Sequence, residues 1–323
     1  MTRKEEIINL LSPRFRRILD FADLDYELLQ EIRLRMNRPL ILIYDGEEYF
    51  INEDGKYSKN SEDGCIVTSV DIKETMEYIS NFSLYAYEDE IRQGFITVQG
   101  GHRIGLAGKV ILEQGRIKNL KHISFVNIRM THEKKGCGKE ILPYIYEQER
   151  ICHTLIISPP GCGKTTLLRD LVRMISDGTV YHCGMNVGVV DERSEIGACY
   201  RGIPQNDVGM RTDVLDCCPK ADGMLMMIRS MSPSIIAVDE IGNRNDIEAL
   251  AYVMNCGCQI LATVHGSSVD DIRNKPVLRK LIEDKLFKRF IVLSGTLKPG
   301  QVETIFDERG SVLYDGRIAR KSY

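Results

Sequence analysis

A glycine-rich loop follows a short apolar segment and precedes a segment with helical character, and this order could bind phosphate groups. Residues 158–166 read SPPGCGKTT, which differs from the Walker A pattern only in having Ser158 at the first glycine position. Successive backbone N–H groups and the positive N-terminus of the helix can surround a polyphosphate. Lys164 can reach the β- and γ-phosphates, and the Thr165 hydroxyl can bind Mg²⁺.

This pattern predicts a site for ATP and Mg²⁺. The alternative is an ordinary glycine turn between a strand and a helix, but the flanking segments favour a phosphate loop. Ser158 shapes the entrance of the loop, whereas the later positions contact phosphate or metal. The residues that we expect to bind the nucleotide are Pro160, Gly161, Cys162, Gly163, Lys164, Thr165 and Thr166, with Thr165 also binding the metal.

Three further apolar segments have the length and composition of buried parallel strands: residues 187–190, 235–238 and 260–264. Each is followed by residues that can act on a metal, a water molecule or a phosphate: residues 191–195, Asp239 with Glu240, and His265. Because the carboxyl ends of parallel strands meet at one edge of a sheet, we expect these side chains to converge with the phosphate loop.

Asp239 and Glu240 form a Walker B pair, in which Asp239 holds Mg²⁺ and Glu240 orients and deprotonates a water molecule. His265 is placed to sense the γ-phosphate, and Glu192 and Glu195 are candidates for contacts with metal-bound water. Each feature also has a plain alternative. The acidic pair could cap a helix, the histidine could be a packing residue, and the two glutamates could be solvated charges.

Phosphoryl transfer builds negative charge that an arginine commonly neutralises. Arg229 lies on the expected helix before Walker B and is a candidate for nucleotide binding. Four other arginines occur in strand-like segments of the first part of the chain: Arg33, Arg35, Arg103 and Arg129. The alternative for each arginine is a surface ion pair.

The composition is that of an ordinary water-soluble protein with room for two domains. The chain has 323 residues, of which 43% are hydrophobic and 28% charged, and its net charge is −3. This charge does not attract nucleic acid, and we find no apolar run of the ~18 residues that a transmembrane helix needs. The N-terminus becomes acidic too early for a signal peptide. We therefore expect a cytoplasmic protein without a transmembrane segment of its own, able to dock on a membrane complex.

The ten cysteines do not have the paired C-x₂-C spacing of a zinc site, which favours buried free thiols. Local signals nevertheless predict several structural elements. These are a helix start at Ser12 and Pro13, a strand at residues 31–36, a hairpin turn at Asp45 and Gly46, a helix at residues 70–82 and a strand-rich segment at residues 94–129.

The elements predict two domains of different class. Residues 1–130 form a small α+β domain, and residues 131–140 are a polar, basic, glycine-containing linker. A basic patch for nucleic acid is the competing interpretation of this short segment. Residues 141–323 alternate strands with helices, which predicts an α/β domain of the RecA-like P-loop type with a mainly parallel sheet.

The order of these motifs resembles the secretion ATPase superfamily, which includes type II and type IV secretion ATPases and pilus retraction motors. The matching features are the phosphate loop, the acidic residues 191–195, Walker B and the histidine after the fourth strand. The resemblance implies a hexameric ring of two-domain protomers, with Arg103 and Arg129 contacting the phosphates of the nucleotide. Ser158 departs from the superfamily, and so does Asp239, where many secretion motors have glycine.

A narrower resemblance, to a sporulation branch of this superfamily, rests on residues 31–35, 100–108 and 190–196. It implies a role in powering or assembling a transport channel between mother cell and forespore. It also implies membrane-embedded sporulation proteins as partners and a peripheral location on the mother-cell side of the membrane.

Our leading hypothesis is an Mg²⁺-dependent ATPase whose domain closure couples hydrolysis to mechanical work. One alternative is a nucleic-acid-dependent RecA-like motor of the helicase or recombinase type. The acidic balance and the scarcity of basic and aromatic tracts argue against a nucleic-acid partner. Another alternative is a nucleotide-gated scaffold that binds ATP and scarcely hydrolyses it.

Overall fold

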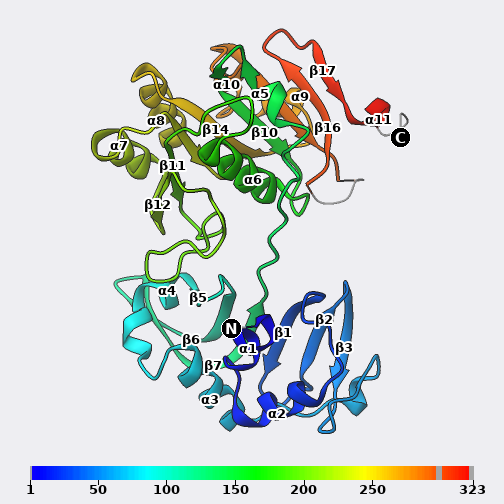
Figure 1. Ribbon diagram of the computed structural model, residues 1–323. Coiled ribbons are helices and arrows are strands. Elements are labelled where there is room, and N and C mark those ends of the chain that lie inside the picture. Colours follow the sequence, from blue (N-terminus) through cyan, green and yellow to red (C-terminus); the bar gives the residue numbers. More distant parts are fainter. Residues whose placement is uncertain (1, 296–299, 320–323) are drawn as a thin grey trace. The chain divides into compact units, whose positions relative to one another are not determined.

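The computed structural model describes residues 2–295 and 300–319 of the chain (Figure 1). The chain divides into two compact units, Met1–His132 and Glu133–Tyr323. The division falls within residues 131–140, the segment to which the sequence analysis assigns a linker.

The first unit is built on a seven-stranded antiparallel sheet with the order β4-β3-β2-β1-β7-β6-β5. Its strands are β1 (Leu29–Arg35), β2 (Ile41–Tyr44), β3 (Glu47–Ile51), β4 (Tyr57–Ser58), β5 (Phe95–Thr97), β6 (Arg103–Glu113) and β7 (Arg116–Arg129). Its α-helices are α1 (Arg3–Ile8), α2 (Pro13–Phe21), α3 (Ser69–Ile79) and α4 (Glu88–Gln93), and two short 3₁₀ helices span Ser61–Asp63 and Leu84–Tyr87.

Two local predictions for this unit are confirmed. The Ser12 side chain accepts a hydrogen bond from the Phe15 backbone N–H, and Pro13 occupies the first turn of α2. Asp45 and Gly46 have φ angles of 49° and 81° in the turn between β2 and β3, which is the backbone of a tight hairpin turn.

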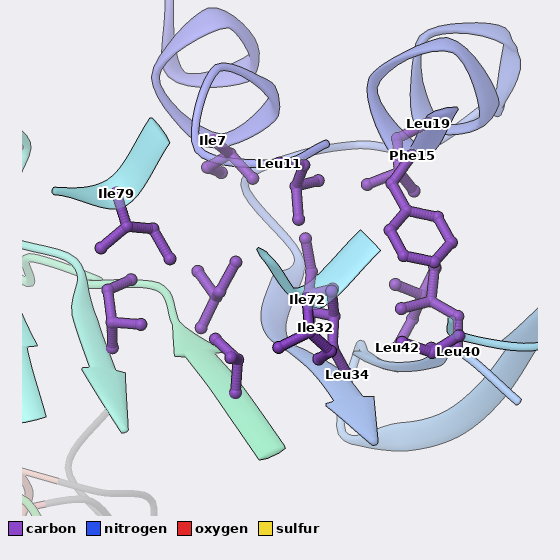
Figure 2. Packing of buried hydrophobic residues seen from close by; sticks show 14 of the residues in the cluster. Ile7, Leu11, Phe15, Leu19, Ile32, Leu34, Leu40, Leu42, Ile72 and Ile79 are labelled. Atoms are coloured by element: carbon purple, nitrogen blue, oxygen red, sulfur yellow. The ribbon is translucent and has the colours of Figure 1, made fainter. Parts of the chain in front are cut away.

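One face of this sheet packs against the helices and forms the core of the unit. Figure 2 shows Ile7, Leu11 and Phe15 from the N-terminal segment above Ile32 and Leu34 of β1. Because side chains alternate along a strand, the charged residues of β1 lie on the opposite face. The arginines of that face come from β1, β6 and β7: Arg33, Arg35, Arg103 and Arg129.

The second unit contains an eight-stranded sheet with the order β12-β11-β13-β14-β10-β15-β16-β17. The first six strands of this order are parallel, and β16 and β17 are antiparallel to their neighbours. The strands are β10 (Thr154–Ser158), β11 (Val187–Asp191), β12 (Thr212–Asp216), β13 (Ile235–Val238), β14 (Gln259–His265), β15 (Arg289–Leu293), β16 (Val302–Asp307) and β17 (Val312–Asp315). A separate two-stranded hairpin is formed by β8 (Tyr146–Glu147) and β9 (Arg150–Ile151).

Helices cover both faces of this sheet, so its central strands are buried. Leu167 and Leu171 of α6 pack on one face, and Met224 of α7 and Leu250 of α8 pack on the other. The helices are α5 (Leu142–Ile145), α6 (Lys164–Asp177), α7 (Lys220–Ser230), α8 (Arg244–Asn255), α9 (Val269–Asn274), α10 (Arg279–Glu283) and α11 (Gly316–Ala319). The sheet is thus mainly parallel, as predicted, and burial on both faces explains the uniformly apolar strand sequences.

The residues directly after the division belong to the second unit. The Lys135 ammonium lies 2.6 Å from a carboxylate oxygen of Asp207. The Gly138 backbone N–H donates a 2.8 Å hydrogen bond to Asp170 of α6. These contacts attach the start of the unit to the loop between β11 and β12 and to α6.

Candidate active site

The glycine-rich loop connects the central strand β10 to α6. Gly161 and Gly163 have φ angles of 74° and 85°, a left-handed backbone conformation that side chains with a Cβ atom adopt at a cost. Gly163 stands at the N-cap of α6, and none of the described side chains caps this helix end. The first N–H groups of α6 therefore remain available for an anionic ligand.

Ser158, the departure from the Walker A pattern, is buried at the end of β10. Its hydroxyl donates a 2.8 Å hydrogen bond to the Pro159 carbonyl, and its own carbonyl accepts a 3.1 Å bond from the Gly266 N–H. The side chain is thus satisfied by neighbouring backbone, and the loop accommodates serine at this position.

The phosphate-loop residues meet the Walker B pair at the carboxyl edge of the sheet. The Thr165 hydroxyl donates a 2.5 Å hydrogen bond to Asp239 Oδ2, and Lys164 Nζ lies 2.5 Å from Glu240 Oε1 and 3.7 Å from Asp239 Oδ1. His265 Nε2 lies 2.9 Å from the same Glu240 oxygen. Five residues that the sequence analysis selected are therefore linked by these contacts into one cluster.

The strand order explains this convergence. Strand β14 lies between β13 and β10, with Val238 paired to Ala262 and Ser158 paired to His265. The residues that follow β13, the last residue of β14 and the loop after β10 consequently meet at one edge.

Thr263 of β14 also belongs to this cluster, although the sequence analysis did not select it. Its hydroxyl donates a hydrogen bond to Asp239 Oδ1 and accepts a 2.9 Å bond from the Glu240 backbone N–H. Glu240 has a φ angle of 55°, which is uncommon for a residue with a side chain. Thr263 thus holds both the Asp239 carboxylate and the strained backbone that directs Glu240. Its only sequence signal is a position two residues before His265, on the same side of the strand.

The Glu240 carboxylate is surrounded by positive groups. Burial by itself raises the pKa of Glu240, but Lys164, Arg193 and His265 outweigh burial and lower this pKa below its usual 4.5. The carboxylate is therefore ionised at neutral pH, which is the state that can accept a proton from water.

The acidic segment after β11 is held by Asp191. Its buried carboxylate accepts 2.8 Å hydrogen bonds from the backbone N–H groups of Glu195, Ile196 and Gly197. Burial raises the pKa of Asp191 to about 6, while these backbone bonds act in the opposite direction. Asp191 thus holds the loop that follows β11 through these three backbone hydrogen bonds.

The next residues of this segment have different partners. The Glu192 carboxylate forms an ion pair with the ammonium of Lys220, at the start of α7. Arg193 Nη1 donates a 2.5 Å hydrogen bond to Glu240 Oε2. The Arg193 side chain, which the sequence analysis did not select, therefore contacts the Walker B pair. The predicted contacts of Glu192 and Glu195 with metal-bound water stay predictions.

Arg229 lies away from this cluster. It is exposed in the last turn of α7, directly before β13 begins, and so lies near the amino end of the strands. The cluster is at the carboxyl edge, and this separation argues against the predicted role of Arg229 in nucleotide binding.

The two arginines predicted to reach the phosphates belong to the first unit. The Arg103 guanidinium lies 3.8 Å from the centre of the Phe95 ring, and Arg129 Nε lies 3.4 Å from Glu31 Oε1. Each guanidinium thus has a partner within its own unit, and the proposed contact with phosphate stays a prediction.

The loop and the Walker B pair fit ATP with Mg²⁺. A threonine hydroxyl and a carboxylate that already share a hydrogen bond are oxygen ligands of the kind that Mg²⁺ takes together with water. The left-handed glycines expose backbone N–H groups where side chains would obstruct phosphate, and Lys164 supplies a positive charge at the same edge.

Cys162 permits a direct test of the loop. Its side chain is half-buried, and its backbone carbonyl accepts a 2.8 Å hydrogen bond from the Gly300 N–H. We expect a bulky maleimide at Cys162 to block ATP binding and bound ATP to protect this thiol, as measured by mass spectrometry of the labelled chain. The exposed Cys183 and Cys256 serve as controls whose labelling should not depend on ATP. Equal labelling of Cys162 with and without ATP would contradict the assignment of the loop.

Two solved structures, an ATPase and a pilus retraction motor, have a similar fold. The chain is similar to the Legionella pneumophila ATPase DotB, with a TM-score of 0.51 and 17% identity over 82% of this chain and 72% of that one. It is also similar to the pilus retraction motor PilT with bound ADP, with a TM-score of 0.52 and 14% identity over 82% and 74% of the two chains. The fold of the second unit is therefore the RecA-like P-loop fold, preceded by a mixed α/β unit, as predicted.

The sequence comparisons define the family more narrowly. The family described as "Sporulation stage III, protein AA" matches residues 1–313. The chain is 44% identical to stage III sporulation protein AA of Bacillus subtilis (strain 168) over 285 residues, which cover 88% of this chain and 89% of that protein. The chain belongs to the stage III sporulation protein AA family, and the resemblance seen in the sequence is confirmed. None of the helices described in residues 2–295 and 300–319 is long and apolar enough to cross a membrane.

Proposed function

We propose that this protein is an Mg²⁺-dependent ATP hydrolase that powers the assembly or operation of a transport channel between mother cell and forespore. The observation that carries the proposal is the convergence of Lys164, Thr165, Asp239, Glu240 and His265 at the carboxyl edge of a parallel sheet. Membership of a sporulation family and the secretion ATPase fold support the cellular role.

Each side chain of the cluster has a distinct task. Lys164 and the N–H groups of the loop bind the phosphates, and Thr165 and Asp239 hold the metal. Bound Mg²⁺ neutralises charge on the phosphate oxygens. Glu240 orients a water molecule and takes its proton as the general base. His265, 2.9 Å from Glu240, senses the γ-phosphate beside the water-activating group.

The wider proposal concerns assembly and location. We place the protein in a homo-oligomer, a hexameric ring, in the cytoplasm at the mother-cell side of the membrane, with membrane-embedded sporulation proteins as partners. Arg103 and Arg129 would contact phosphate upon domain closure, and loosening of this contact after hydrolysis would let the domains rotate.

The test is ATP hydrolysis by the full chain together with its particle mass, with and without Mg²⁺ and nucleotide. We expect phosphate release that EDTA abolishes and a nucleotide-dependent increase in mass. ATP binding without turnover, even with the membrane partners present, would instead support a nucleotide-gated scaffold. Hydrolysis stimulated by DNA, with salt-sensitive DNA binding, would support a nucleic-acid motor.

A further inference from the structure

Three basic side chains converge on the single carboxylate of Glu240. Lys164 and His265 approach Oε1 at 2.5 and 2.9 Å, and Arg193 approaches Oε2 at 2.5 Å. Arg193 comes from the loop after β11, whereas the other two come from α6 and β14. Each carboxylate oxygen thus has its own cationic partner.

The contact between Lys164 and Glu240 competes with the proposed contact between Lys164 and the phosphates of the nucleotide. An ammonium that moves to the phosphates cannot remain 2.5 Å from Glu240. The Glu240 side chain is only 17% exposed, and a carboxylate with little access to water is destabilised when its cation leaves. A second cation that stays on Glu240 therefore reduces this cost when ATP binds.

We propose that Arg193 is a positioning residue that holds Glu240 when Lys164 transfers to the phosphates. This inference rests on the proposed function. Arg193 is suited to the task because its guanidinium donates to Glu240 Oε2, the oxygen that Lys164 does not contact. His265 is less suited, because it shares Oε1 with Lys164 and its charge depends on its protonation.

Arg193 therefore acts on ATP binding through Glu240 and needs no contact of its own with phosphate. Without Arg193, Glu240 depends on Lys164, and the two must separate before phosphate can bind. If residue 240 carries no charge, this competition disappears. The effect of removing Arg193 should therefore depend on the presence of the Glu240 carboxylate.

The experiment is a double-mutant cycle on nucleotide affinity, measured by calorimetry with Mg²⁺ and the non-hydrolysable analogue AMP-PNP. We expect Arg193→Ala to weaken binding about 5-fold, the upper range for an ion pair whose arginine side chain is 59% exposed and screened by solvent. In the Glu240→Gln background the same substitution should change affinity less than about 2-fold. Arg193→Lys should recover most of the affinity in the Glu240 background, because it restores the charge.

Controls separate this effect from folding and from net charge. Arg244→Ala removes one positive charge from an 85% exposed side chain of α8 that pairs with Glu248, and should bind AMP-PNP like the unmodified chain. Thermal melting without nucleotide shows whether each variant is folded.

The outcomes distinguish the possibilities. Equal weakening by Arg193→Ala in both backgrounds would show that Arg193 contacts the nucleotide itself and would overturn the inference. Unchanged affinity in both backgrounds would also overturn it, while the proposed function would stand. Failure of the unmodified chain to bind AMP-PNP would contradict the proposed function as well.

Discussion

Replacing Glu240 with glutamine is expected to reduce Mg²⁺-dependent ATP turnover by about 10²- to 10⁴-fold, the usual contribution of a general base. The amide keeps the size of the side chain but cannot take a proton from water. Binding of ATP should be retained, because glutamine removes the carboxylate that holds Lys164 at 2.5 Å without removing any group of the phosphate loop. Phosphate release under single-turnover conditions and nucleotide affinity are the two measurements.

A matched control for this variant is Glu248→Gln. Glu248 is 65% exposed on α8 and pairs with Arg244. Its replacement by glutamine removes the same single negative charge as Glu240→Gln but leaves the cluster of Lys164, Asp239, Glu240 and His265 intact. It should leave turnover unchanged. Undiminished hydrolysis by Glu240→Gln would show that Glu240 is not the group that activates water.

Lys164→Ala should weaken ATP binding about 100-fold. The substitution removes a charge-assisted contact, which alone corresponds to roughly 10- to 100-fold in affinity. It also leaves the carboxylates of Asp239 and Glu240 without the ammonium that lies 3.7 and 2.5 Å from them, so that they repel the phosphates. Equilibrium binding of ATP with Mg²⁺ measures the loss.

The control for this variant is Lys73→Ala, which removes a lysine that is 79% exposed on α3 of the first unit. It should bind ATP normally. Lys164 is buried and paired, so thermal melting should accompany the binding measurement to show that the variant is folded. Normal ATP affinity in folded Lys164→Ala would contradict the assignment of the phosphate loop.

The central strands of the second unit were predictable because each is buried on both faces. The apolar segments at residues 187–190 and 235–238 correspond to β11 (Val187–Asp191) and β13 (Ile235–Val238). Such continuous apolar runs are produced by parallel strands between two layers of helices. The glycine-rich loop was equally predictable, since its pattern depends on local backbone conformation at Gly161 and Gly163.

Other strands left no comparable signal. β12 (Thr212–Asp216) is half-buried along its whole length, because it pairs only with β11 at the edge of the sheet. Its sequence mixes aspartate with apolar residues and shows no uniform run. The antiparallel strands β16 and β17 likewise lie at the opposite edge, where partial exposure permits polar residues.

Two partners of Glu240, Thr263 and Arg193, could be identified only from the three-dimensional structure. Thr263 lies near the end of β14 and Arg193 lies just after β11. Along the chain they are 23 and 47 residues from Glu240. Threonine within a strand and arginine within a charged loop are common, so neither residue type indicates a site. Their contacts arise because β11 and β14 flank β13 on its two sides.

The amino-acid sequence alone determined the chemistry that this protein can carry: a phosphate loop, a Walker B pair and a histidine, each following an apolar strand. These signals are local, since they depend on backbone conformation and burial within a few residues. Only the tertiary structure decided that Lys164, Arg193 and His265 share the Glu240 carboxylate, and that Arg229 lies away from it. The physical reason is that strand order and the edge at which a residue emerges set these contacts, and neither is encoded in local spacing.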